Sequence, residues 1–285
     1  MIMKHALIPL LLVMAGVSAC GADPDAQAVE RALAFNGGEA AAAGPASAAV
    51  DPALPLPARL GAWARRFLAA GGATYCFGLN DDGYAAQGRL VLDDRQDCIS
   101  LLYRTTELAR AADGREAVAW ALRTRFAGAR PADVVGPDGR VDYDHPAHLD
   151  YSLDMVRSGW WGEDVTAQLT GARADSLGTA RYPAGSFVWV PEDALVPGEL
   201  QEGDIAWLVL APDDARARAM RDEHGLVIGH VGIVIVKDGE PWLVHAASSG
   251  LEGWYDGDAV VEVPVVAYLA RVERYGGLIV TRFGG

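Results

Sequence analysis

Cysteine and histidine are the residues in this sequence whose placement is most typical of nucleophilic chemistry. Cys98 follows Asp97 at the start of a predicted helix, and aspartate is among the best residue types for capping a helix N-terminus. Because a helix N-terminus stabilises negative charge, we expect this position to lower the pKa of the Cys98 thiol toward the nucleophilic thiolate. His230 and His245 lie on two consecutive predicted strands, and antiparallel neighbours would bring their side chains side by side.

These side chains are sufficient for a cysteine hydrolase if the fold brings them together. A cysteine nucleophile needs a base within hydrogen-bond reach, and the base needs a third group that holds its tautomer. Cys98, His230 and His245 could fill those three roles. One alternative is a zinc site, since three such ligands and a water form a catalytic set. The other is a structural role, with Cys98 as a small buried side chain or half of a disulfide and each histidine as a core or surface residue.

The segments that would position these residues show helical spacing first and strand alternation later. Helices are predicted over 58–70, 98–112, 114–125 and 265–275. Short β-branched runs between turn residues predict strands over 203–210, 229–236, 241–247, 259–264 and 276–282. Helices followed by a mainly antiparallel sheet predict an α+β fold.

Composition limits the function classes that remain. The 285 residues are 51% apolar, which is typical of a globular protein rather than a disordered one. The formal net charge is −14 without a cluster of Lys and Arg, and this argues against nucleic acid as a partner, because phosphate binding needs clustered basic side chains. Three cysteines are too few for a disulfide scaffold, so each needs its own explanation.

The first cysteine belongs to a predicted export signal. Residues 1–19 combine Lys4 with an apolar run that is shorter than the roughly 20 residues of a membrane-spanning helix. The end of this segment, at Cys20, resembles a bacterial lipobox, in which the cysteine is lipidated and becomes the mature N-terminus. Ordinary secretion with cleavage elsewhere is the alternative. We therefore expect an exported bacterial lipoprotein, anchored to a membrane through Cys20, with its domain in the periplasm or otherwise outside the cytoplasm.

The region after the signal divides into a linker and a domain. Residues 20–55 are rich in Ala, Gly, Pro and Asp without an apolar period, which predicts a flexible tether. Residues 56–285 form one predicted domain. Within it, 131–202 is irregular and reads as an insertion between the cysteine helix and the first histidine strand.

An ordered set of motifs resembles the NlpC-type cell-wall cysteine hydrolases, whose fold is a reduced papain-like one. These motifs are Asp97-Cys98-Ile99-Ser100, Gly203-Asp204-Ile205, Gly229-His230-Val231-Gly232-Ile233 and Val244-His245-Ala246. The N-acetylmuramoyl-L-alanine amidase-like branch is the most similar, because it also has a long insertion before the histidine strand. Motifs similar to that branch are the segment 148–166, His245-Ala246-Ala247-Ser248-Ser249, Ala267-Tyr268-Leu269 and the segment 277–282. The cysteine helix continues differently from that branch, which leaves the bond cleaved open.

The resemblance implies roles for particular residues. Cys98 is the implied nucleophile, His230 the base and His245 the third residue that orients it. Tyr75 is implied to lie near the thiol, where its hydroxyl and the backbone N–H of Cys98 would hold the oxyanion. No metal and no other cofactor is implied.

The implied substrate is peptidoglycan or a soluble muropeptide. The negative charge of the chain favours the soluble fragment over the anionic polymer. Two amide bonds compete: the lactyl–L-Ala amide, which the branch favours, and a γ-D-Glu bond of the stem peptide. Alternatives from other classes are a non-catalytic wall-binding lipoprotein and an acyl transferase with the same three residues.

Aromatic residues of the insertion carry a weaker expectation. They could line a sugar- or peptide-binding groove or pack onto the core, and they are Tyr151, Trp160, Trp161 and Trp189. His145 and His148 are expected to be surface or structural residues.

Two further segments remain open. The mixed-charge segment 213–223 is expected to be a solvated extension of a hairpin, placed where it could gate the site. Cys76 follows Tyr75 and is either a buried thiol or the partner of Cys98 in a regulatory disulfide.

Overall fold

The computed structural model describes residues 23–45, 50–71, 73–149, 153–176 and 178–284, and its centre is an antiparallel sheet. The strands are β3 (Glu163–Asp164), β4 (Arg173–Ala174), β5 (Val188–Pro191), β6 (Ile205–Leu210), β7 (Ile228–Lys237), β8 (Glu240–Ala247), β9 (Ala259–Pro264) and β10 (Tyr275–Arg282). Their order is β4-β5-β10-β6-β7-β8-β9, and β3 also pairs with β10. The strands β6 to β10 are those predicted from the β-branched runs, so the α+β prediction is confirmed.

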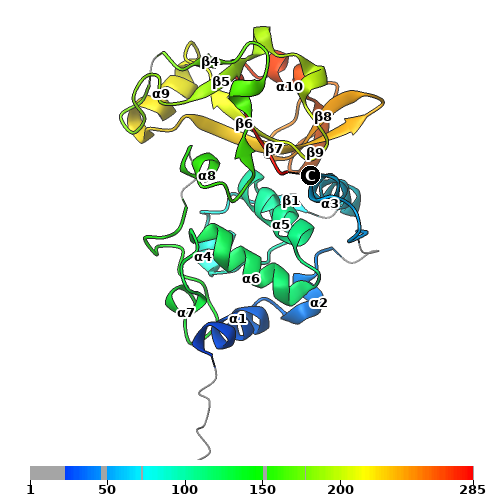
Figure 1. The fold of residues 1–285 in the computed structure, drawn as a ribbon, viewed down its shortest axis with the longest axis vertical. Helices are drawn as coiled ribbons and strands as arrows, with labels where there is room; N and C mark the ends of the chain where they lie inside the picture. The colour runs from blue at the N-terminus through cyan, green and yellow to red at the C-terminus, as the bar shows by residue number, and fades with distance from the viewer. Residues whose placement is uncertain (1–22, 46–49, 72, 150–152, 177, 285) are drawn as a thin grey trace, which may run out of the picture.

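Helices cover both faces of this sheet (Figure 1). On one face lie α3 (Leu56–Ala70) and α5 (Cys98–Arg110), and α6 (Gly114–Arg125) packs against α5 on the side away from the sheet. On the other face lies α10 (Val265–Arg271). Side chains of β7 alternate between these two layers: Ile233 belongs to the core shared with α3 and α5, whereas Val234 packs with the residues of α10. The four predicted helices are therefore present, and α5 begins at the cysteine as expected.

A tight turn joins the two strands that carry the histidines. Asp238 and Gly239 have φ values of 52° and 83°, and Lys237 pairs with Glu240 across the turn. Two consecutive residues with positive φ are typical of the hairpin turns whose twist matches that of the flanking strands. This turn fixes the register of β7 against β8, and with it the relative height of His230 and His245.

The flexible tether predicted over 20–55 is wrong for its first half. Residues Pro24–Phe35 form α1 and Gly38–Ala42 form α2, and α1 packs on α6 and on α7 (Pro131–Val134). Ala28, Val29 and Leu33 are buried in this contact. The prediction failed because alanine was counted as linker composition, although alanine is the best helix former and small enough for close helix packing.

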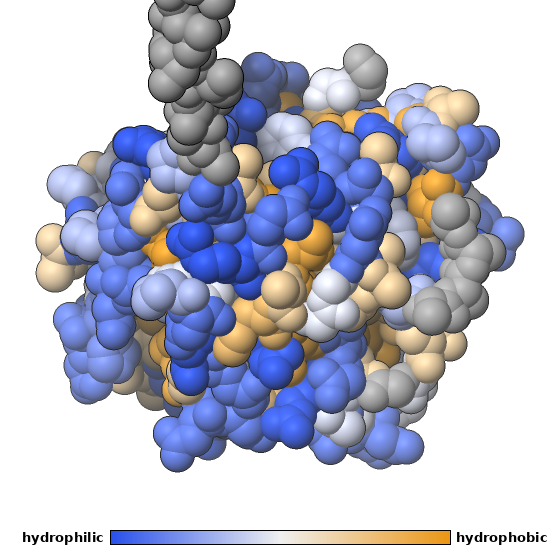
Figure 2. Space-filling view, turned by 90° about the horizontal axis from the view of Figure 1, so that it is seen from below, coloured by the Kyte–Doolittle hydropathy of each residue, from blue (hydrophilic) through white to orange (hydrophobic). Residues whose placement is uncertain are grey.

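The surface at this end of the molecule agrees with that arrangement. Figure 2 views it from below, and the visible face is largely hydrophilic with apolar residues scattered over it. The buried residues of α1 are apolar, so its apolar side is turned inward. The predicted signal peptide and Cys20 lie outside the described residues, and no helix of the described part is long and apolar enough to cross a membrane.

The predicted insertion 131–202 contains only short elements. Besides α7 and β3 to β5 it has α8 (Leu153–Arg157) and three 3₁₀ turns, Thr166–Gln168, Glu192–Ala194 and Pro197–Glu199. The mixed-charge segment connects β6 to its antiparallel neighbour β7 and is largely exposed, in agreement with the predicted solvated hairpin extension. Its helical conformation was not predicted: Ala215–His224 form α9, whose first turn is capped by Asp214. The cap favours the helix, because its carboxylate accepts the backbone N–H of Ala217 at 2.8 Å.

Candidate active site

Cys98 is the first residue of α5, and its position is fixed by the residue before it. Asp97 Oδ1 accepts the backbone N–H of Ser100 at 2.7 Å, while Ser100 Oγ accepts the N–H of Asp97 at 2.8 Å, which completes a capping box. Asp97 Oδ2 accepts the N–H of Gly78 at 2.8 Å. One buried carboxylate therefore holds both the helix that carries the thiol and the loop after Tyr75.

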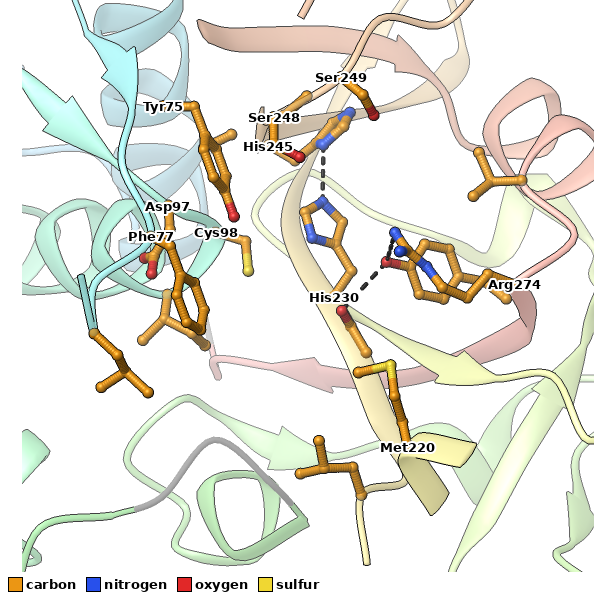
Figure 3. Close-up of a pocket in the computed structure, with 18 of the residues that line it drawn as sticks. Tyr75, Phe77, Asp97, Cys98, Met220, His230, His245, Ser248, Ser249 and Arg274 are labelled. Atoms are coloured by element: carbon orange, nitrogen blue, oxygen red, sulfur yellow. Dashed lines mark hydrogen bonds between the residues drawn. The ribbon is translucent and has the colours of Figure 1, made fainter. Parts of the chain in front are cut away.

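The two histidines meet across β7 and β8. His230 Nε2 lies 2.8 Å from His245 Nδ1, so one of these nitrogens donates a hydrogen bond to the other (Figure 3). Their rings are nearly perpendicular, at 88°. His245 Nε2 is buried and has no hydrogen-bond partner among the described residues. A buried polar atom without a partner needs a physical explanation, and a catalytic role is one such explanation.

Tyrosines enclose the histidine pair. The ring of Tyr275 is stacked on that of His230, with centroids 6.0 Å apart, and Tyr268 lies edge-on to His245 at 4.8 Å. The hydroxyl of Tyr275 donates to the carbonyl of Gly229. These contacts limit ring rotation, so the imidazoles keep one orientation relative to Cys98.

Burial sets the protonation states. It lowers the pKa of His230 well below its usual range, and His245 and Arg274 add to the effect. It also lowers the pKa of His245 to about 3. Both imidazoles are therefore neutral at pH 7.

The expected thiolate at Cys98 is not supported. Burial and the charge of Asp97 raise the pKa of the thiol, and the backbone N–H groups of Val231, Cys98 and Ile99 lower it less than burial raises it. The helix N-terminus acts in the predicted direction, but desolvation by the protein around the thiol outweighs it. In the free protein the pair is thus a neutral thiol beside a neutral imidazole.

These residues line a cavity of about 640 Å³. Cys98, His230, His245 and Tyr75 all contribute to its wall, so the fold brings together the four predicted site residues. Figure 3 shows the Cys98 thiol between Tyr75 and the histidine pair.

Tyr75 reaches the thiol through a short parallel pairing. It lies on β1 (Thr74–Tyr75), which pairs with β2 (Arg95–Gln96) so that Tyr75 is opposite Gln96, two residues before the cysteine. Burial raises the pKa of Tyr75, and the charge of Asp97 acts in the same direction. Its hydroxyl therefore stays protonated and can donate a hydrogen bond into the cavity.

Other predicted residues lie elsewhere. Trp161 and Trp189 are buried in the core, Trp160 packs against it, and none of the three is in the described lining of the cavity. Of the two alternatives left open for these residues, packing onto the core is therefore the one that holds. Tyr151 lies outside the described residues. His148 does line the cavity, where its ring contacts Phe126 and Tyr143.

Cys76 and Cys98 are both free thiols. Cys76 donates to Asp82 Oδ1 at 3.3 Å and is absent from the described lining of the cavity. The disulfide with Cys98 remains a hypothesis.

Several residues that line the cavity were not predicted from the sequence. They come from segments far apart in the chain: Phe77, Leu79 and Arg274 lie in loops, whereas Met220 and His224 lie on α9. None of these five belongs to a predicted motif, unlike Ser248, Ser249 and Tyr268, which also line the cavity. Met220 lies in the segment 213–223, which was expected to be placed where it could gate the site.

The geometry gives no support to the zinc alternative. Nitrogens of His230 and His245 face each other at 2.8 Å and cannot both direct a lone pair at one metal ion. No group of three or more His, Cys, Asp or Glu side chains arranged to hold a metal is found in the described part of the chain.

No protein-family model matches this chain, and no curated protein is significantly similar to it in sequence. Its fold is similar to that of a crystal structure of an N-acetylmuramoyl-L-alanine amidase from Bacteroides uniformis, at 19% identity and a TM-score of 0.53, over 81% of this chain and 99% of that one. A proposed xylanase from Bacteroides fragilis is similar at 20% identity and a TM-score of 0.51, over 77% and 99%. A Legionella pneumophila protein of the DUF1460 family is similar at 14% identity and a TM-score of 0.54, over 79% and 88%. At these identities the chain shares the fold of these proteins.

Proposed function

We propose that this protein is a cysteine-dependent amide hydrolase of the NlpC type that acts on peptidoglycan or muropeptides. Cys98 is the nucleophile, His230 the base and His245 the residue that orients it. The observation that carries the proposal is the 2.8 Å contact between His230 Nε2 and His245 Nδ1, in the cavity that also exposes the thiol at the start of α5. A reduced papain-like fold remains part of this proposal.

The contact between the histidines decides which nitrogen can act as a base. If His230 Nε2 carries the proton and donates it to His245 Nδ1, then Nδ1 of His230 keeps a lone pair for the thiol. With His245 donating instead, His230 would carry its proton on Nδ1 and could not accept another there. The first tautomer is therefore the active one.

The reaction follows from this arrangement. As the sulfur forms a bond to the amide carbonyl carbon, His230 Nδ1 takes the thiol proton. It then gives this proton to the leaving amine as the C–N bond breaks. Water cleaves the thioester in the second half, with His230 again as the base, and releases the acid and the free thiol. A neutral resting pair suits this sequence, because charge develops only in the transition state.

We assign the stabilisation of the oxyanion to two donors. The backbone N–H of Cys98 is at the first turn of α5, where N–H groups have no carbonyl partner within the helix. The protonated hydroxyl of Tyr75 lines the same cavity. Removing one such donor typically lowers kcat by about 10²–10³-fold.

The lactyl–L-Ala amide is the bond that we propose, making the protein an N-acetylmuramoyl-L-alanine amidase. The name of the Bacteroides uniformis structure supports this choice, although the xylanase name of another neighbour shows that the shared fold alone does not decide it. A γ-D-Glu bond in the stem peptide is the second candidate. Export and lipid attachment at Cys20 complete the proposal and place the enzyme at a membrane outside the cytoplasm.

The test is digestion of defined muropeptides by the wild type and by His230→Asn, with product masses read by mass spectrometry. We expect the wild type to release free N-acetylmuramic acid or its glycan, and the variant to be slower by about 10²–10⁴-fold, which is the usual contribution of a general base. Cleavage within the stem peptide would establish the endopeptidase instead. Absence of any product would leave a wall-binding protein, and products joined to an added amine would indicate an acyl transferase.

A further inference from the structure

The two sides of the reacting pair differ in chemistry. Figure 3 shows Phe77 beyond Cys98 on one side and Arg274 beyond His230 on the other. Phe77 and Leu79 line the cavity, yet 47% and 68% of their surface is exposed. The cysteine side of the cavity is therefore apolar, and the histidine side carries a guanidinium.

The apolar side is held in place. Between Phe77 and Leu79, the N–H of Gly78 donates to Asp97, the residue that also caps α5. A Cβ on Gly78 would lie 2.1 Å from the ring of Tyr84, so the backbone approaches that ring more closely than any other residue would allow. The backbone between Phe77 and Leu79 is thus fixed, and these two exposed apolar side chains lie beside the nucleophile. Exposed apolar side chains grouped at a cavity are typical of a surface that a ligand covers.

The guanidinium is also held in place. Arg274 Nη2 donates to the hydroxyl of Tyr275 at 2.7 Å, and the guanidinium carbon lies 4.8 Å from the centre of that ring. Tyr275 is also stacked on His230, with ring centroids 6.0 Å apart. Burial lowers the pKa of His230, and the guanidinium charge of Arg274 lies close enough to lower it further.

The charge of the cavity contrasts with that of the chain. The whole protein carries a net charge of −14. Among the described lining residues, Asp97 is the only acid, and its two oxygens accept the N–H groups of Ser100 and Gly78. Arg274 and Arg181 also line the cavity, and Arg181 pairs with Asp154. The described wall of the cavity therefore lacks the acidic excess of the whole chain, and a guanidinium in such a wall favours anionic ligands.

The proposed reaction determines which part of the substrate faces Arg274. His230 must reach the nitrogen of the leaving amine, whereas the sulfur of Cys98 binds the acyl carbon. The amine product therefore extends past His230 toward Arg274, and the acyl group extends past Cys98 toward Phe77 and Leu79.

We propose that Arg274 binds a carboxylate of the leaving amine, so that the preferred substrate is an amide whose amine portion is a short acidic peptide, with an apolar face on the acyl portion. This inference rests on the proposed function. For a muropeptide, it means that a stem with a free α-carboxylate on its glutamate is preferred over the same stem with a carboxamide there. A guanidinium binds a planar carboxylate through two parallel hydrogen bonds, which a carboxamide cannot reproduce.

Binding tests the inference independently of cleavage. Calorimetric titration of Cys98→Ala with N-acetylmuramoyl-L-alanyl-D-glutamate and with its isoglutamine analogue compares ligands that differ only at that carboxylate. We expect the acid to bind about 10–100-fold more tightly, the usual range for a hydrogen bond to a charged group. Adding Arg274→Gln should bring the ratio close to one, and adding Arg274→Lys should preserve part of it. Arg271→Gln, at a neighbouring exposed arginine that is not among the described lining residues, is the matched control and should keep the full ratio.

The outcomes separate the two proposals. Equal binding of acid and amide, binding of neither, or a preference that survives Arg274→Gln would overturn the role of Arg274. A preference in binding without cleavage by the wild type would sustain the carboxylate site and overturn the hydrolase. Cleavage of both ligands at equal rates and affinities would do the reverse.

Discussion

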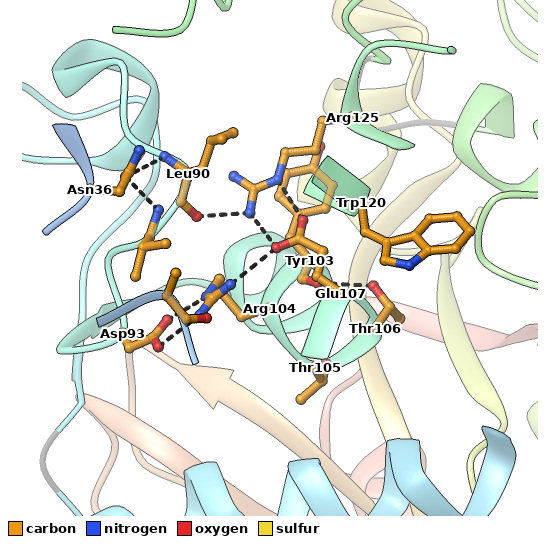
Figure 4. Close-up of polar contacts among 12 residues, drawn as sticks. Asn36, Leu90, Asp93, Tyr103, Arg104, Thr105, Thr106, Glu107, Trp120 and Arg125 are labelled. Carbon is orange, nitrogen blue, oxygen red and sulfur yellow. Dashed lines mark hydrogen bonds and ion pairs between the residues drawn. The ribbon is translucent and has the colours of Figure 1, made fainter. Parts of the chain in front are cut away.

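The two ends of α5 hold buried polar groups in opposite ways. At the N-terminal end, the histidine pair beside Cys98 keeps one ring nitrogen without a partner and faces a cavity. Toward the C-terminal end, Arg104 and Glu107 are both about 1% exposed and belong to a buried ion network with Arg125 (Figure 4). None of the nitrogen or oxygen atoms of these three side chains lacks a partner.

The partners in this network tie distant segments to α5. Arg125 donates to both oxygens of Glu107, at 2.8 and 2.9 Å, and Arg104 donates to both oxygens of Asp93. Arg104 also reaches the carbonyl of Ala42, at the end of α2, and Arg125 reaches that of Leu90. The same helix thus has a fully satisfied end that holds the N-terminal helices and an incompletely satisfied end that is open to a ligand.

This difference separates the residues that we expect to contribute to stability from those that we expect to contribute to function. A complete network has no capacity left for a substrate, so its loss should affect folding. An incomplete one at a cavity is available for chemistry, so its loss should affect turnover.

The largest expected effect on stability is at Glu107. Glu107→Gln leaves two buried guanidinium groups without their shared carboxylate and should lower the free energy of unfolding by about 3–5 kcal/mol. Urea unfolding measures it. The control is Glu30→Gln in the exposed pair with Arg115, where we expect a far smaller loss, because solvent screens exposed ion pairs. A Glu107→Gln protein that is as stable as the wild type but inactive would contradict the assignment of this network to stability rather than to function.

A smaller effect is expected from pH. The unfolded chain protonates its histidines near pH 6.5, whereas burial keeps His230 and His245 neutral to lower pH in the folded state. The unfolded state therefore binds more protons below that pH, and stability falls as pH drops through about 6.5, by about 1 kcal/mol per histidine at pH 5.5.

His245→Gln isolates one of these contributions. The difference in unfolding free energy between pH 7.5 and 5.5 should shrink by about 1 kcal/mol in this variant. His224→Gln, at an exposed histidine, is the matched control and should leave the difference in place. An unchanged difference in His245→Gln would mean that the pair is not kept neutral by burial.

Periodicity and local chemistry predicted the elements and the site residues that depend on near neighbours. Alternation placed the strands, and the Asp97 cap placed Cys98 at the start of α5. Two histidines on consecutive strands joined by a turn were predicted to lie side by side, and their ring nitrogens are 2.8 Å apart. The resemblance supplied Tyr75.

What failed depends on tertiary packing. The Cys98 thiol stays protonated because burial in the folded chain and the charge of Asp97 both raise its pKa. Together these two effects outweigh the effect of the helix dipole. Alanines of α1 became core because α6 and α7 cover them. Phe77 and Arg274 come from separate loops, so their position on either side of the reacting pair exists only in the folded chain.

The most direct test of the central claim is the rate of muropeptide cleavage by Cys98→Ala relative to the wild type, with unfolding measured on the same samples. Loss of the nucleophile should lower kcat by about 10⁴-fold or more. The free energy of unfolding should change by less than about 1 kcal/mol, because one sulfur atom in a cavity wall contributes little packing. A folded Cys98→Ala protein that cleaves the substrate at the wild-type rate would contradict the assignment of Cys98 as the nucleophile.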